Sequence, residues 1–241
     1  MSVSSHIHAR TAQALPLRYV LVLFLGLCGG AIAQESPAPA PTPPPASMPS
    51  VARSVRISFL PPPLEGTISL GIYNEWDQLV RVLHQEASLD EFAVGADALT
   101  TKWDGKNDDG EDLPAGKYQA RGYLVGNLKV EDAGNQTPPP EDWNGNPVVP
   151  IRLVANPLAK DERPVLDLAV GFDDENSFLK TTDGLPLYTV APKPNVRRAF
   201  IKKNGEKSVD IWEDDGATVG QLRVSNVDKM MAFDCGDFEL K

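Results

Sequence analysis

The chain has 241 residues, a formal net charge of −10, three His and two Cys. An acidic surface repels phosphate backbones and anionic membranes, so nucleic acid is not an expected partner. So few His and Cys exclude a disulfide framework and leave little material for a zinc site, and no cofactor is expected.

The N-terminal segment has the order of a secretory leader. Arg10 and Arg18 precede an apolar run from Tyr19 to Cys28, and Ala31-Ile-Ala33 provides the small residues that a signal peptidase recognises. We therefore expect residues 1–33 to be a signal peptide, and the protein to be secreted, periplasmic or held in the cell envelope. An uncleaved anchor and a lipid attached at Cys28 are the alternatives.

Residues 34–50 form a Pro/Ala-rich tract that we interpret as a disordered spacer, with a polyproline ligand as the alternative. The apolar run of the leader is too short to span a bilayer comfortably, and we expect no transmembrane helix in the cleaved chain. Cleavage would remove His6, His8 and Cys28 and leave His84 and Cys235 as the only His and Cys. We interpret Cys235 as a small buried residue and not as a nucleophile.

Residues 51–130 alternate apolar and polar side chains, which is typical of half-buried strands. Asn74 to Gln78 lies between two such runs and suits a hairpin turn. A short helical piece is predicted within residues 88–98. Trp103 is predicted to end a strand with its ring directed inward, and Tyr118 to begin the face of the next strand.

The segment from Trp103 to Tyr118 is the most specific part of the chain. It contains two turn dipeptides in which glycine permits positive φ, followed by a proline where a strand can begin. Its structural residues are Trp103, Asp104, Gly105, Asp109, Gly110, Pro114, Ala115, Gly116 and Tyr118. Asp104 to Asp112 is acidic, but an EF-hand count back from Gly110 puts Gly105 at the first ligand position. Turn chemistry is therefore preferred to a calcium site, and no metal site is predicted.

The stretch from Gly66 to Val125 resembles the FlgD Ig-like domain, the immunoglobulin-like module of the bacterial flagellar hook-capping protein. The resemblance rests on Ile72-Tyr-Asn74, Leu79 to Leu83, and the segment from Trp103 to Tyr118, and Gln78 departs from the usual turn glycine. It implies an immunoglobulin-like β-sandwich over residues 51–130. This module recurs in exported surface proteins as a spacer or assembly unit, and the flagellar role is not carried over.

Residues 131–150 are predicted to be a Pro-rich connector, and residues 151–241 a second β-rich domain, either a meander or a small sandwich. The expected fold class is therefore all-β. No nucleophile elbow, P-loop or zinc-protease motif is present in the sequence, and we expect a structural or binding protein and not an enzyme. The expected partner is an envelope protein or a glycan, and Trp76, Trp143 and Trp212 could form a carbohydrate platform, with Trp76 and Trp143 as the candidate binding residues. The alternative interpretation is that Trp103 and Trp212 are core residues and the other two cover loops.

Overall fold

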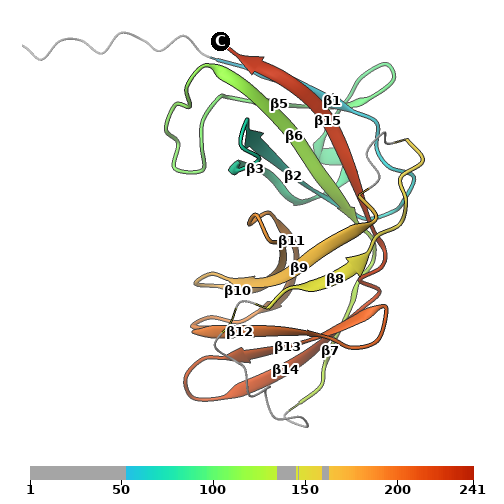
Figure 1. Cartoon of the computed structure of the whole chain (residues 1–241), viewed down its shortest axis with the longest axis vertical. Helices are drawn as coiled ribbons and strands as arrows, with labels where there is room; N and C mark the ends of the chain where they lie inside the picture. The colour runs from blue at the N-terminus through green and yellow to red at the C-terminus, as the bar shows by residue number, and fades with distance from the viewer. Residues whose placement is uncertain (1–52, 135–144, 146, 159–162) are drawn as a thin grey trace, which may run out of the picture. The chain divides into compact units, whose positions relative to one another are not determined.

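The computed structural model describes residues 53–134, 145, 147–158 and 163–241 (Figure 1). The predicted signal peptide and Pro/Ala-rich tract lie outside these residues. The described chain is all-β with antiparallel sheets, as predicted. Its strands fall into two sandwich-like groups, each built from two sheets around one apolar core.

The first sandwich contains a three-stranded sheet in the order β1-β5-β4 and a four-stranded sheet in the order β15-β6-β2-β3. Its strands are β1 (Val55–Phe59), β2 (Thr67–Asn74), β3 (Leu79–Ala87), β4 (Ala93–Val94), β5 (Leu99–Trp103), β6 (Gly116–Val125) and β15 (Met230–Leu240). The helical piece predicted within residues 88–98 is a single 3-10 turn, η1 (Leu89–Glu91), which a capping box at Ser88 begins.

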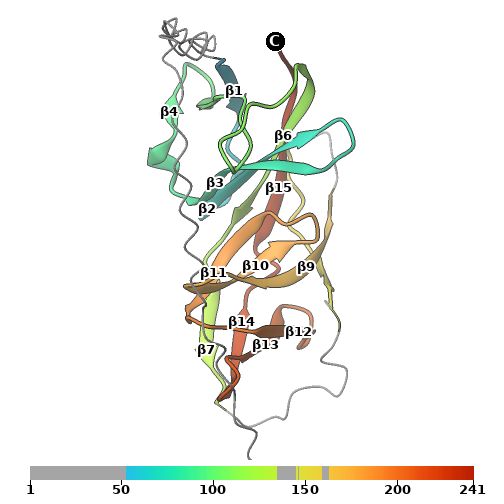
Figure 2. The ribbon, with the colours of Figure 1, turned by 90° about the vertical axis from the view of Figure 1, so that its left-hand side faces the viewer.

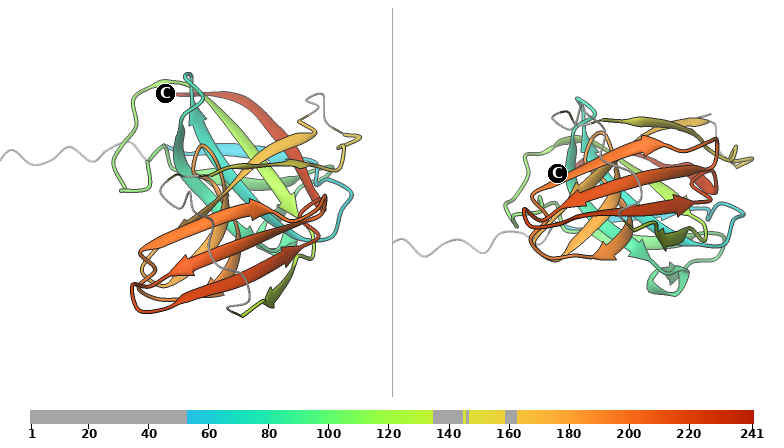
Figure 3. Two further views of the ribbon diagram at one scale, coloured as in Figure 1. Left: turned by 60° about the horizontal axis from the view of Figure 1, so that its bottom comes forward. Right: turned by 90° about the horizontal axis from the view of Figure 1, so that it is seen from below.

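The second sandwich joins a sheet in the order β11-β10-β9-β8 to one in the order β12-β13-β14-β7 (Figure 3). Its strands are β7 (Lys129–Asp132), β8 (Val149–Arg152), β9 (Val165–Phe172), β10 (Asn176–Thr181), β11 (Pro186–Pro192), β12 (Arg198–Lys203), β13 (Ser208–Asp214) and β14 (Val219–Ser225). Glycines with positive φ lie in its turns, among them Gly184, Gly205 and Gly216, which agrees with the turn dipeptides in the sequence.

Two strands lie in different sheets from those that the predicted domain boundaries suggest. β7 falls at the boundary near residue 130 and pairs with β14 of the second sandwich. β15, the last strand, pairs with β6 along its whole length and completes a sheet of the first sandwich (Figure 2). The second sandwich is therefore inserted between β6 and β15. Alternation of side chains predicts that a segment is a strand but does not predict its partner, because pairing depends on contacts distant in sequence.

The sheet β15-β6-β2-β3 contributes side chains to both cores. One face of β6, which includes Ala120 and Leu124, contributes to the core of the first sandwich. The other face contributes Tyr123 and Val125 to the core of the second sandwich. Polar contacts add to this packing, since Thr189 of β11 donates two hydrogen bonds to the Glu86 carboxylate of β3 at 2.7 and 2.5 Å. The two sandwiches therefore share apolar packing and are not linked by a connector alone.

The ends of the β6–β15 ladder have different neighbours. At one end Gly116 pairs with Leu240, and a Cβ placed on the nearby Gly105 would lie 3.0 Å from Leu240 and 3.4 Å from Arg53. The start of β1 and the end of β15 therefore lie close together, as Figure 1 shows. At the other end Val125 pairs with Met230, and the chain crosses there to the second sandwich. The insertion point and the start of β1 thus lie at opposite ends of one ladder.

Candidate binding site

The segment from Trp103 to Tyr118 forms core and turns, as the sequence predicts. Trp103 has no exposed area, its ring contacts those of Tyr118 and Phe238, and its indole nitrogen donates to the carbonyl of Lys106 at 2.9 Å. Gly105 and Gly110 both have positive φ, at 79° and 80°. The carboxylate of Asp104 accepts the amide of Lys106, and Pro114 accepts the Tyr118 hydroxyl just before β6 begins at Gly116. Asp109 and Ala115 are exposed. These residues therefore shape the sandwich and do not converge on a ligand.

The acidic loop between β5 and β6 lies along the edge of β3. The carboxylate of Asp108 accepts the backbone amide of Val82 at 3.0 and 3.2 Å, and the Arg81 guanidinium donates to the carbonyl of Asn107 at 2.7 Å. No group of three or more His, Cys, Asp or Glu side chains in the described part of the chain is arranged to hold a metal ion. An uncovered edge strand can pair with another molecule, and this loop occupies that edge.

We expect Asp108→Ala to lower the free energy of unfolding by about 1 kcal/mol, because it leaves an amide of β3 without its charged acceptor. The measurement is urea unfolding followed by far-UV circular dichroism. Asp109→Ala is the matched control, since Asp109 is exposed and makes no hydrogen bond to a described residue. Equal stability of the two variants would show that the loop does not protect the edge.

Of the three tryptophans considered for a platform, Trp76 is 71% exposed, whereas Trp212 is 3% exposed and cannot contribute. Trp76 lies at the tip of the β2–β3 hairpin, in the turn that the sequence predicts. Trp143 lies outside the described residues. Trp103 and Trp212 are buried, which confirms the core assignment for those two.

The turn that carries Trp76 is held by its own polar contacts. The side-chain oxygen of Asn74 accepts the backbone amides of Trp76 and Gln78, both at 3.0 Å. Asp77, with a φ of 59°, forms a 3.3 Å ion pair with Arg121, whose guanidinium lies 3.8 Å from the centre of the Tyr73 ring. Trp76 is therefore an exposed aromatic residue on a well-braced turn.

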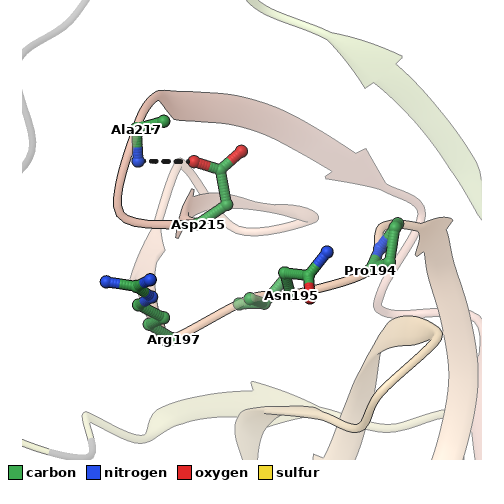
Figure 4. A pocket seen from close by; sticks show the side chains of 6 residues that line it. Pro194, Asn195, Arg197, Asp215 and Ala217 are labelled. Atoms are coloured by element: carbon green, nitrogen blue, oxygen red, sulfur yellow. Dashed lines mark hydrogen bonds between the residues drawn. The ribbon is translucent and has the colours of Figure 1, made fainter.

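An open hollow of about 490 Å³ lies at one end of the second sandwich (Figure 4). It is formed by the segment between β11 and β12 and by the β13–β14 turn. Its lining consists of Pro194, Asn195, Val196, Arg197, Asp215 and Ala217. β14 begins at this end and reaches the crossing to β15 only after Ser225. The hollow therefore lies at the end of β14 that is remote from the insertion point.

Two ion pairs are formed by residues close in sequence to the lining of the hollow. Lys193 approaches the carboxylate of Glu213 at 3.6 Å, and Glu213 also accepts a hydrogen bond from Ser177. Arg198 contacts the carboxylate of Asp214 at 2.5 Å. The Glu213 side chain is 2% exposed, so this end of the core contains a buried carboxylate. The sequence interpretation missed the site, although three cations between residues 193 and 198 and three successive acids at 213–215 were a visible signal.

Asp215 closes the β13–β14 turn. Its carboxylate accepts the backbone amide of Ala217 at 2.8 Å, as Figure 4 shows. It also accepts the backbone amide of Thr218 at 2.7 Å and the Thr218 hydroxyl at 2.9 Å. The backbone hydrogen bonds are the main cause of its lowered pKa, which falls to about 2. Hydrogen bonds to a carboxylate favour the charged form.

We expect the β13–β14 turn to lose stability in acid. Because the pKa of Asp215 is lower in the folded state, its contribution is complete above the unfolded pKa near ~4 and is lost as the pH falls through about 2. Amide exchange and chemical shifts of Ala217 and Thr218 between pH 5 and 2 measure this. In Asp215→Asn the turn amides should show no such pH dependence, and a titration unchanged by this substitution would contradict the assignment.

His84 and Cys235 have structural environments. A ring nitrogen of His84 lies 2.7 Å from the Thr101 hydroxyl, its ring packs against Phe92, and burial lowers its pKa. Burial, together with the nearby Asp234 charge, raises the pKa of the Cys235 thiol well above its usual range. A thiol is a weak nucleophile unless it is deprotonated. The Cys235 thiol is therefore a weak nucleophile, and the His84 ring is engaged by the Thr101 hydroxyl and Phe92.

Comparisons with protein-family models, curated proteins and solved structures gave no match. Within the described ranges, no helix is long and apolar enough to cross a membrane.

Proposed function

We propose that this chain is an exported, non-enzymatic assembly or binding protein of the bacterial cell envelope that carries a FlgD-type Ig-like module. The leader and the Pro/Ala-rich tract in the sequence support export and a tether. The turns and core around Trp103 support the module, because the residues that carry the resemblance have the structural roles that such a motif requires.

The observation that carries this proposal is the insertion of the second sandwich between β6 and β15. The chain enters β1 beside the end of β15, at the opposite end of the ladder from the crossing near Val125 and Met230. A tether at residues 34–50 would therefore hold the first sandwich, and the inserted sandwich would extend from the other end of the ladder. Shared apolar packing fixes this arrangement, as a spacer or assembly unit requires.

Site-specific photo-crosslinking in the producing cell tests the proposal. A photoreactive residue is placed at Ala217, on the hollow, or at Ser58, an exposed position of β1 next to the tether. We expect defined envelope adducts from position 217 and none from position 58. Adducts from position 58 alone, or full retention of the protein in the cytoplasm, would contradict the proposed role.

Carbohydrate binding through Trp76 is the second candidate, and the exposure of Trp76 on a braced turn favours it. Aromatic faces of this kind supply apolar contact area at little cost in side-chain entropy. A glycan array probed with the purified protein tests it. Binding that is lost in Trp76→Ala and kept in Leu60→Ala, a 54% exposed control, supports this candidate, whereas equal binding by both variants contradicts it.

A further inference from the structure

The part of the second sandwich next to the hollow carries three cations, at positions 193, 197 and 198, and three acids, at positions 213–215, and two ion pairs are found among these described residues. Lys193 approaches Glu213 and Arg198 pairs with Asp214, as described above. The third cation, Arg197, and the third acid, Asp215, both line the hollow and form no ion pair with each other.

Asp215 is held by its own turn, because it accepts three hydrogen bonds from Ala217 and Thr218. Two of these bonds go to Oδ1, and one goes to Oδ2. A carboxylate oxygen can accept more than one hydrogen bond, so Oδ2 retains acceptor capacity. Asp215 can therefore accept a further donor without leaving the turn.

Arg197 is exposed and has no acidic partner among the described residues. A Cβ placed on Gly216 would lie 2.6 Å from Nη1 and 2.7 Å from Cζ of Arg197, so the guanidinium lies directly against the backbone of Gly216. Its side chain forms no hydrogen bond or ion pair with any described residue. A planar guanidinium matches the two oxygens of a carboxylate.

We propose that this hollow binds the carboxylate-bearing ring of an acidic sugar. The carboxylate contacts Arg197, and the ring hydroxyls hydrogen-bond with Asn195 and with Oδ2 of Asp215. Figure 4 shows Asn195 and Arg197 on one segment, with Asp215 on the turn opposite. The apolar surface of Pro194 completes the lining. The proposed function assigns partner binding to this end of the second sandwich. The inference names the class of ligand bound there and therefore rests on the proposed function.

A sugar suits this hollow better than a peptide or a simple anion. Peptides are commonly bound along a free strand edge or in an apolar groove. Here two turns form the hollow, and its lining offers both hydrogen-bond donors and acceptors. A small anion would gain only the Arg197 contact, whereas the hydroxyls of a sugar ring can in addition donate to Asp215 and hydrogen-bond with Asn195.

Titration of the purified exported protein with methyl β-glucuronide tests the proposal, with methyl β-glucoside and acetate as matched probes. Amide shifts in the ¹H–¹⁵N spectrum are the readout. We expect saturable shifts at Asn195, Arg197 and Ala217 with the glucuronide, and binding at least about tenfold weaker for both other probes. Equal binding of acetate, or no shift at these residues, would overturn the proposal.

Two variants locate the site. Arg197→Gln should weaken glucuronide binding about tenfold or more, and Arg56→Gln, an exposed arginine on β1, should leave it unchanged. An equal effect of the two would overturn the proposal. If position 217 still forms envelope adducts but the glucuronide does not bind, the acidic sugar is rejected as the ligand. The proposed function, in which this end of the second sandwich contacts envelope partners, is then retained. Glucuronide binding by a protein that forms no envelope adduct would keep the acidic-sugar site but reject the proposed function.

Discussion

Trp103→Ala is expected to lower the free energy of unfolding by about 3–5 kcal/mol, the usual cost of removing a large buried aromatic side chain. The Trp103 ring is buried between the two sheets of the first sandwich, where it contacts Tyr118 and Phe238. The substitution opens a cavity there. It also leaves the carbonyl of Lys106 without its indole donor, within the turn that positions Gly105. Guanidinium unfolding followed by circular dichroism gives the value.

Trp76→Ala is the matched control, because it removes the same side chain from a position that is 71% exposed. We expect its stability to lie within about 0.5 kcal/mol of the unsubstituted protein. Similar losses in the two variants would mean that Trp103 is not the centre of this core.

Lys193→Met is expected to lower the free energy of unfolding by about 3 kcal/mol. It removes the ammonium group 3.6 Å from Glu213 and leaves a carboxylate that is 2% exposed, whose remaining side-chain partner among the described residues is the Ser177 hydroxyl. A buried charge that loses its partner is more destabilising than the absence of the whole pair. The same unfolding experiment at pH 7 measures the effect.

The double variant Lys193→Met, Glu213→Gln isolates the pair, because a neutral amide can still bond to Ser177. We expect it to recover most of the stability that Lys193→Met loses. Lys102→Met, on an exposed position of β5, controls for the loss of a surface charge. If the double variant were no more stable than Lys193→Met, the loss would come from altered packing and not from the unpaired carboxylate.

Local features of the fold could be predicted from the sequence because they depend on neighbouring residues. The Asn74 turn, the positive φ at Gly105 and Gly110, and the inward Trp103 all follow from local turn and strand chemistry. The exposure of Trp76 is also a local feature, because this residue lies at the tip of a predicted turn. The all-β class follows from the alternation of side chains repeated along the chain.

The partners of β7 and β15 could not be predicted in this way. The alternating pattern of β15 is satisfied in any sheet with one buried face, and its pairing with β6 joins residues that lie more than a hundred positions apart. The resemblance between Gly66 and Val125 includes β6 but ends before the strand that completes its sheet. Tyr123 and Val125 illustrate the consequence: they face the core of the second sandwich, which a free module would expose to solvent.

The candidate hollow was hidden for a related reason. Arg197 and Asp215 lie on separate turns, and only the pairing of Arg198 in β12 with Asp214 in β13 brings those turns together. The position of the Arg197 guanidinium also requires glycine at position 216, because a side chain there would occupy the same space.

Hydrogen exchange on a chain that ends at Asp228, compared with the full chain, tests the interlocked arrangement most directly. This truncation removes β15 and leaves residues 51–130 intact. Our account predicts that the amides of β6, from Gly116 to Val125, lose their protection along with those of β2, because their sheet loses a strand and part of both cores. Unchanged protection of β2 and β6 would show that residues 51–130 fold as an independent unit, and would contradict the account.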